Sequence, residues 1–193
     1  MSRLSNDDWL TLLEIARRSI SSAVLEQCFP EIPSYSQALK ISRGAFVSLY
    51  RGGKLRGCVG QVEDLGPLAE VVARAAIGAA LHDPRFAPVG ANEIASLQIE
   101  LSVLSPLECL APEAIIAGKH GLVVSRGRST AVQLPQVASE RCWSAQKFLE
   151  QTCEKAGLPA DAWRDSETRI LGFTVELYPE REAGGGKVPV PMP

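Results

Sequence analysis

The chain has 193 residues, 46% of them hydrophobic and 22% charged, which are the proportions of a soluble globular protein. Lys and Arg number 20 and Asp and Glu 22, a net charge of −2, so the strongly basic footprint of a general nucleic-acid-binding protein is missing, although a local basic patch is not excluded. The first residues include acids where a signal peptide needs an apolar core. The most apolar stretch, 68–81, contains Glu70 and Arg74 and is too short to span a bilayer. We therefore expect a cytoplasmic protein without a membrane segment.

The first half of the chain predicts a helix and then a β-hairpin. Ser5, followed three residues later by Asp8, is typical of a helix N-cap, and apolar residues at spacings of three and four continue over 9–24. Residues 44–51 and 54–60 are predicted strands joined by Gly52-Gly53, which supplies the positive φ angles of a tight turn. Period-two geometry places three residues of the second strand on the core face, namely Leu55, Gly57 and Val59, and four on the other, namely Lys54, Arg56, Cys58 and Gly60. Leu55 and Val59 are expected to be buried.

The second half predicts three further strands or hairpins and two more helices. A mostly buried helix follows Pro67 and ends at Asp83-Pro84, and a half-buried strand covers 97–103. Two short strands, 122–125 and 131–134, flank a polar turn, and a second capped helix begins near Ser144. A last strand is expected to direct four residues inward, namely Leu171, Phe173, Val175 and Leu177. The obvious hairpin and the alternating strands predict an α+β fold with a largely antiparallel sheet flanked by helices, ending in a disordered tail at 181–193.

The five cysteines, at positions 28, 58, 109, 142 and 153, do not suggest a disulfide framework, because their number is odd and their spacing wide. No pair has the C-x-x-C spacing of a zinc or redox motif, and the chain has two histidines. We expect reduced thiols, no metal site and no cofactor.

Five blocks occur in a fixed order along the chain: LRGCVG at 55–60, DPRF at 83–86, GKHGL at 118–122, LPQVA at 134–138 and CEKAGL at 153–158. Together they resemble the AMMECR-type domain, whose prokaryotic members include protein A of the AmmeMemoRadiSam system. The resemblance covers nearly the whole chain and implies a single α+β domain over residues 5–180 with two unequal lobes. It also implies possible Memo-like and radical SAM partners, but no established activity. Val59 departs from the family motif, which usually has Ile there, a loss of one methylene.

The LRGCVG block is the candidate site because it combines a thiol, a guanidinium and two glycines. A thiolate is the reactive form of cysteine and a nearby cation stabilises it, so Arg56 is expected to activate Cys58. Gly57 and Gly60 leave room for a substrate to approach backbone N–H groups, or else they serve close packing. His120, in a Gly-flanked turn, is the candidate base. The same loop position also suits a histidine that hydrogen-bonds its own loop.

Arg85 is a candidate ligand for an anion, or a partner of Asp83. The three blocks LRGCVG, DPRF and GKHG are expected to converge around one concavity.

Two functions of different classes remain open, and whether the chain is an enzyme stays undecided. The first is a small-molecule site in which Cys58 is a reactive thiol assisted by Arg56 and His120. The second is a non-catalytic module that docks a Memo-like or radical SAM protein. No phosphate loop, dinucleotide fingerprint or hydrolase motif is present to choose between them.

Overall fold

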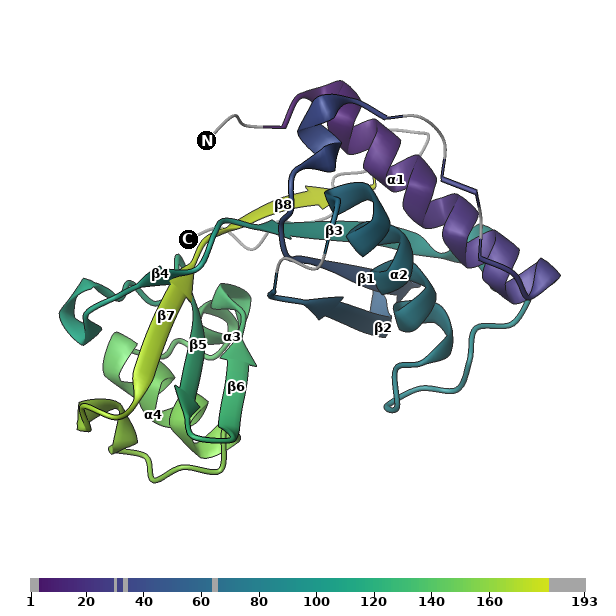
Figure 1. Cartoon of the computed structure of the whole chain (residues 1–193). Helices are drawn as coiled ribbons and strands as arrows, with labels where there is room; N and C mark the ends of the chain where they lie inside the picture. The colour runs from purple at the N-terminus through teal and green to yellow at the C-terminus, as the bar shows by residue number, and fades with distance from the viewer. Residues whose placement is uncertain (1–3, 30, 33–34, 64–65, 181–193) are drawn as a thin grey trace. The chain divides into compact units, whose positions relative to one another are not determined.

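The computed structural model describes residues 4–29, 31–32, 35–63 and 66–180. The chain forms two compact units, and the described part of the first consists of residues up to 103 together with 176–180. The second unit consists of residues 104–175. Each unit contains one four-stranded sheet with helices against it, so the predicted α+β class is confirmed, but the strands form two sheets instead of one (Figure 1). The predicted disordered tail at 181–193 lies outside the described residues.

The first unit is a four-stranded sheet covered on one face by two long helices (Figure 1). Its strand order is β2-β1-β3-β8, so β2 is an edge strand, and β1 pairs antiparallel with both β2 and β3. The elements of this unit are α1 (Asn6–Ser21), a π-helical turn (Ser22–Glu26), a 3-10 turn (Gln37–Lys40), β1 (Ala45–Arg51), β2 (Lys54–Gln61), α2 (Leu68–Leu81), a 3-10 turn (Ile94–Ser96), β3 (Gln98–Leu104) and β8 (Val175–Pro179).

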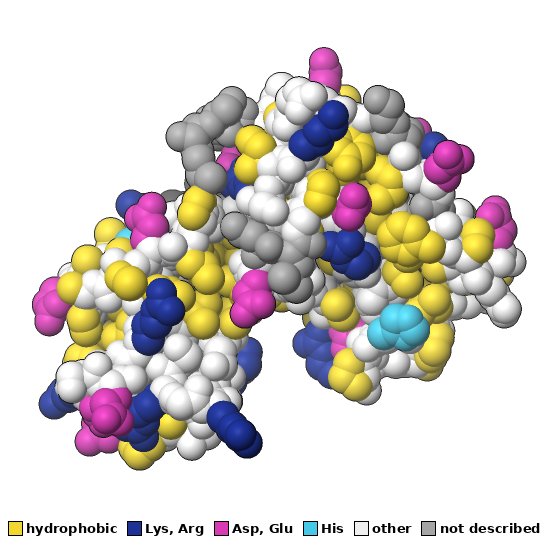
Figure 2. All heavy atoms as spheres, in the orientation of Figure 1, with side chains coloured by type: hydrophobic (Ala, Val, Ile, Leu, Met, Phe, Trp, Pro, Cys, Tyr) yellow, Lys and Arg dark blue, Asp and Glu magenta, His cyan; other side chains and the backbone are white. Residues whose placement is uncertain are grey.

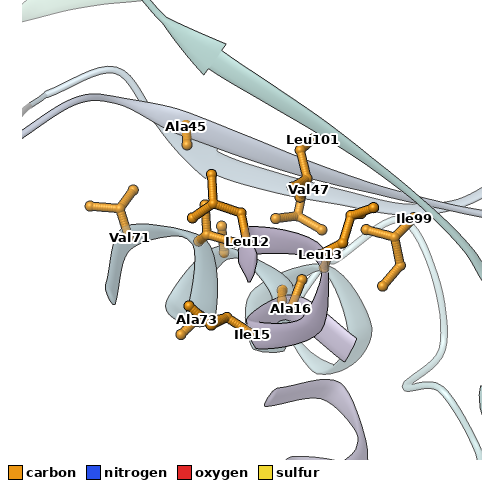
Figure 3. Packing of buried hydrophobic residues seen from close by; sticks show 14 of the residues in the cluster. Leu12, Leu13, Ile15, Ala16, Ala45, Val47, Val71, Ala73, Ile99 and Leu101 are labelled. Carbon is orange, nitrogen blue, oxygen red and sulfur yellow. The ribbon is translucent and has the colours of Figure 1, made fainter. Parts of the chain in front are cut away.

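The core of the first unit lies between α1, α2 and the sheet. α1 begins where the sequence predicts, because the Ser5 side chain accepts from the Asp8 backbone N–H and the Asp8 side chain accepts from that of Ser5. Leu12 from α1 and Val71 from α2 pack toward Val47 of β1, and all three are fully or almost fully buried (Figure 3). Ten of the 14 residues of α2 are buried, as its nearly continuous apolar sequence predicts.

The prediction that Leu55 is buried is wrong, because β2 carries a β-bulge. Tyr50 pairs with Leu55, but the preceding residue of β1, Leu49, pairs with Gly57. Arg56 is therefore the extra residue of β2. The bulge shifts the alternation of side chains, and Leu55 therefore lies on the face opposite Leu49 and is 38% exposed. Beyond the bulge the predicted pattern holds, with Gly57 buried and Val59 packed against the core.

The second unit contains the sheet β4-β7-β5-β6, with α3 and α4 lying against one face (Figure 1). Phe148, Leu149 and Cys153 of α4 are buried with Leu122 and Val124 of β5, and Trp143 and Trp163 pack against this cluster. Its elements are β4 (Glu108–Cys109), a 3-10 turn (Pro112–Ala114), β5 (Gly121–Arg126), β6 (Ser129–Gln133), α3 (Pro135–Glu140), α4 (Ala145–Lys155), a 3-10 turn (Ala162–Arg164) and β7 (Arg169–Phe173).

The last predicted strand is two strands, which belong to different sheets. β7 ends at Phe173 and β8 begins at Val175, so the chain leaves the second sheet and enters the first across Thr174. Phe173 is buried as predicted, but Leu177 is 39% exposed and the prediction of its burial is wrong. An uninterrupted alternation along the sequence carries no sign of the point at which a strand changes sheets.

Candidate functional site

The LRGCVG and DPRF blocks meet at the free edge of β2. The backbone N–H of Cys58 donates to Asp83 Oδ2 at 2.8 Å, and Arg85 Nη2 donates to the Cys58 carbonyl oxygen at 3.3 Å. Asp83 and Arg85 are joined by a two-point ion pair, with Nε to Oδ1 at 3.0 Å and Nη2 to Oδ2 at 2.7 Å. A carboxylate and a guanidinium thus occupy the positions that the backbone of a neighbouring strand would take. We call these two residues the Asp83 clamp.

The two members of the Asp83 clamp differ in exposure. The Asp83 side chain is 3% exposed, whereas that of Arg85 is 57% exposed. Hydrogen bonds from Arg85, and after them those from the backbone of Cys58 and Arg85, hold the pKa of Asp83 well below its usual value against the opposing effect of burial. Asp83 raises the pKa of Arg85, and the nearby Cys58 thiol adds to that effect. Arg85 Nη1 donates no hydrogen bond within the described part of the chain, and the guanidinium lies 5.5 Å from the centroid of the Phe86 ring.

Arg56 is held by a second carboxylate, Glu93. Nε and Nη2 of Arg56 donate to the two Glu93 oxygens at 3.0 and 2.9 Å, and its remaining contacts are to backbone carbonyls of Ala87 at 2.8 Å and Pro88 at 3.3 Å. Glu93 also accepts from Arg51 Nη1 and from the Gly90 N–H, both at 2.9 Å. The hydrogen bonds from Arg56 are the main cause that lowers the pKa of Glu93 to about 2. We call Glu93 and these partners the Glu93 clamp.

The two glycines of LRGCVG permit close packing. A Cβ on Gly57 would overlap the carbonyl oxygen of Ala79 in α2, and one on Gly60 would overlap the backbone of Ala45 and the side chain of Phe46. Helix α2 approaches β2 reciprocally at Gly78, where a Cβ would lie 2.8 Å from a Val59 methyl.

The Cys58 thiol lies on the face of the sheet opposite α1 and α2. It is half-buried and accepts a hydrogen bond from the hydroxyl of buried Ser48 at 3.3 Å. Ser48 and Cys58 are direct partners in the β1–β2 register, and they are opposite each other only because the Arg56 bulge shifts that register by one residue.

His120 belongs to the second unit, immediately before β5. Its Nδ1 accepts from the Ile116 backbone N–H at 3.2 Å, so the imidazole bonds within its own loop. Burial, and after it the charge of Lys119, lowers the pKa of His120. GKHGL also lies close to the helix of LPQVA, since a Cβ on Gly118 would be 2.6 Å from Ser139 Oγ. The convergence of this loop with LRGCVG and DPRF remains a prediction.

Of the surface hollows formed by the described residues, we consider one in each unit, and neither of these two is lined by Cys58, Arg85 or His120. The one in the first unit, about 430 Å³, lies near the C-terminal ends of α1 and α2, and Val24, Phe29 and Leu81 are among its lining residues. The other, about 480 Å³, lies in the second unit beside Trp163 and Thr168. Figure 2 shows hydrophobic side chains at several places on the visible surface.

In the described residues no three His, Cys, Asp or Glu side chains gather closely enough to hold a metal ion. No described helix has the length and apolarity needed to cross a membrane.

Three contributors to this region were not singled out as site residues by the sequence. The sequence predicts Asp83 as the end of a helix and as a partner of Arg85, and this pairing is present, but Glu93 and Ser48 carry no signal. Glu93 lies 37 positions from Arg56 in sequence, so its role depends on how the loop after α2 returns to β2. The register of a two-residue hairpin without a bulge predicts that Ser48 lies opposite Gly57. In the structure the bulge places Ser48 opposite Cys58.

The two-unit α+β fold and the five ordered sequence blocks, from LRGCVG to CEKAGL, are those expected of one protein family. The sequence model of the AMMECR1 family matches residues 13–178, and the chain belongs to this family. A protein of Methanothermobacter thermautotrophicus is 40% identical over 185 residues, covering 92% of this chain and 96% of its own length. One of Thermococcus onnurineus is 38% identical, covering 93% of this chain and 94% of its own length.

The fold also matches a solved structure. The crystal structure of the uncharacterized protein PH0010 from Pyrococcus horikoshii is 36% identical to this chain, with a TM-score of 0.86, covering 92% of this chain and 93% of that one.

Proposed function

We propose that this protein carries a small-molecule site on its first unit, formed by the Cys58 thiol and the Arg85 guanidinium. The observation that carries the proposal is the difference between Arg56 and Arg85 in exposure and in hydrogen bonding. Arg56 is 17% exposed and uses all three of its nitrogens inside the fold, whereas Arg85 is 57% exposed and keeps Nη1 free of hydrogen bonds to the described residues. Arg85, not Arg56, is therefore the cation that would stabilise a Cys58 thiolate and bind an acceptor group of a ligand.

The surroundings of the thiol support this assignment. The Ser48 hydroxyl donates to Cys58 Sγ at 3.3 Å, which orients the thiol on this face of the sheet. The strand that carries the thiol is fixed at its edge by the Asp83 clamp and on its core face by α2. A rigid strand that carries the thiol, with the Arg85 guanidinium bound to its edge, presents two groups at a constant separation, as a binding site requires.

The test is a timed iodoacetamide reaction on the folded protein, with each cysteine quantified by peptide mass as pH is varied. Cys28, Cys109 and Cys142 are exposed and Cys153 is buried, so they provide internal references for access. We expect Cys58 to react faster at neutral pH than the exposed three, although it is less accessible than they are. Reaction of Cys58 only on unfolding would sink the proposal.

A second candidate is a non-catalytic module that docks a Memo-like or radical SAM protein. Two observations favour it. Arg56, Gly57 and Gly60 make contacts within the fold. His120 hydrogen-bonds within its own loop, so the thiol has no assigned base. Co-elution of the folded Cys58→Ser protein with purified Memo-like and radical SAM proteins distinguishes the two. Partner binding that is lost on this substitution, with slow alkylation of Cys58, would favour the module. Either function fits a cytoplasmic protein, where five free thiols remain reduced.

A further inference from the structure

The Asp83 clamp fixes the backbone of the residue whose thiol the proposed function uses. Cys58 donates to Asp83, Asp83 pairs with Arg85, and Arg85 donates back to Cys58, so the three residues close a ring of hydrogen bonds. The carboxylate oxygens of Asp83 also accept from the Arg85 backbone N–H at 3.1 Å. Arg85 is therefore held at both its main chain and its side chain, even though more than half of its side chain is exposed.

We propose that Asp83 is a positioning residue, which holds the Arg85 guanidinium against Cys58 and thereby sets the reactivity of the thiol. This inference rests on the proposed function, because it assumes that Cys58 is the reactive group. A guanidinium has a planar fork that matches a carboxylate at two points, so Asp83 fixes the orientation of Arg85. Without this partner, an arginine on an exposed loop retains several rotatable bonds and populates many positions.

If Asp83 acted only through its negative charge, it would slow the reaction of Cys58, whereas a positioning role predicts that it accelerates the reaction. The two roles can therefore be distinguished by experiment. An anion beside a thiol disfavours the thiolate, so a carboxylate acting only through its charge slows the reaction of Cys58. A carboxylate that holds the cation in place accelerates it. Two further charged residues are Arg56, two positions away on β2 and bound to Glu93, and Glu100, which lies opposite Ser48 in the β1–β3 register.

The experiment compares alkylation of Cys58 by iodoacetamide in the wild type, Asp83→Asn and Glu93→Gln between pH 6 and pH 9. We expect Asp83→Asn to slow the reaction about tenfold at pH 7 and by less at pH 9, since a released Arg85 no longer lies against Cys58. Glu93→Gln is the matched control, because it breaks the other carboxylate–arginine pair that contacts β2. Its alkylation profile should stay that of the wild type. An unchanged or faster reaction of Asp83→Asn overturns the inference.

A second variant, Arg85→Lys, keeps the inference testable if Asp83→Asn does not fold. Lysine retains the positive charge but lacks the fork that contacts both Asp83 oxygens and the Cys58 carbonyl. We expect a loss of rate close to that of Asp83→Asn, whereas a wild-type profile would mean that charge alone suffices and would overturn the inference. Slow alkylation of Cys58 in the wild type is a different outcome, because it contradicts the proposed function itself.

Discussion

The two halves of β2 on either side of the Arg56 bulge are held in different ways. Before the bulge, Lys54 and Leu55 are exposed, and Arg56 itself is fixed by the Glu93 clamp. After it, Gly57 and Val59 pack on α2, and Cys58 is fixed at the strand edge by the Asp83 clamp. The first half is held by its pairing with β1 and by the Glu93 clamp, whereas the second is held in addition by packing on α2 and by hydrogen bonds to its outer backbone edge. The difference teaches that the two glycines and the single arginine of LRGCVG have separate structural roles. The Cys58 thiol is left as the group whose contact in the fold is its hydrogen bond from Ser48.

The largest effect is expected at Gly57, where packing of the second half is tightest. A Cβ in Gly57→Ala would overlap the Ala79 carbonyl oxygen, so β2 and α2 must separate, at a cost of at least about 3 kcal/mol in the free energy of unfolding. Gly52→Ala is the control, because its Cβ meets no atom within 4 Å and its φ of 55° costs only about 1–2 kcal/mol. Urea unfolding at pH 7 measures both. Equal losses would mean that α2 and β2 are not in close contact.

The first half of β2 should depend on Glu93. Glu93→Gln leaves the Arg56 guanidinium, 17% exposed, without its counter-charge, and we expect a loss of about 3 kcal/mol in the free energy of unfolding. The control is Glu70→Gln, which breaks the ion pair with Arg74, in which both side chains are 43% exposed, and should cost less than about 0.5 kcal/mol. If the two variants unfold at the same urea concentration, the Glu93 clamp does not stabilise the strand.

Both clamps predict a loss of stability in acid. The pKa values of Asp83 and Glu93 are lowered in the folded chain, that of Glu93 to about 2, so their stabilisation is complete above the unfolded values near 4 and is lost as pH falls through the folded values. The free energy of unfolding should therefore decrease below about pH 4. The difference between wild type and Glu93→Gln should shrink from pH 4 toward pH 2.5. A difference that stays constant over this range would contradict the assignment of the pair.

The smallest effect tests the bulge. Leu55→Ala should cost less than about 0.5 kcal/mol, because this side chain lies outside the core, whereas Val59→Ala should cost about 1 kcal/mol, because Val59 packs on α2. Thermal unfolding of the two variants side by side provides the comparison. A larger loss for Leu55→Ala would place Leu55 in the core and remove the bulge.

The sequence predicts most of the elements but not how two of the strands are divided or aligned. The α1 cap, the hairpin at Gly52-Gly53 and the buried α2 follow from local patterns, namely Ser5 with Asp8, paired glycines and a run of small apolar residues. The bulge at Arg56 is decided by the packing of Gly57 on α2, which is a tertiary contact. The change of sheet at Thr174 likewise has no local signal.

The candidate site was predicted less completely, for the same reason. Cys58 and Arg85 were identified by residue type, and the structure brings their blocks together. The ion pair of Arg56 with Glu93 is not predictable from the sequence, because Glu93 is brought to Arg56 by the fold of the loop after α2. The pairing of Asp83 with Arg85 is predicted from the sequence, but the hydrogen bond of its carboxylate to the outer edge of β2 is not, because that bond depends on how the chain after α2 returns to the strand.

Hydrogen exchange at the Cys58 backbone amide tests most directly whether the Asp83 clamp closes the edge of β2. This amide points away from β1, so its protection must come from Asp83 and not from the sheet. The account predicts that the Cys58 amide is protected in the wild type and exchanges far faster in Arg85→Gln and Asp83→Asn, while the amides of β1 bonded to β3 keep their protection. Rapid exchange of the Cys58 amide in the folded wild type would contradict the account.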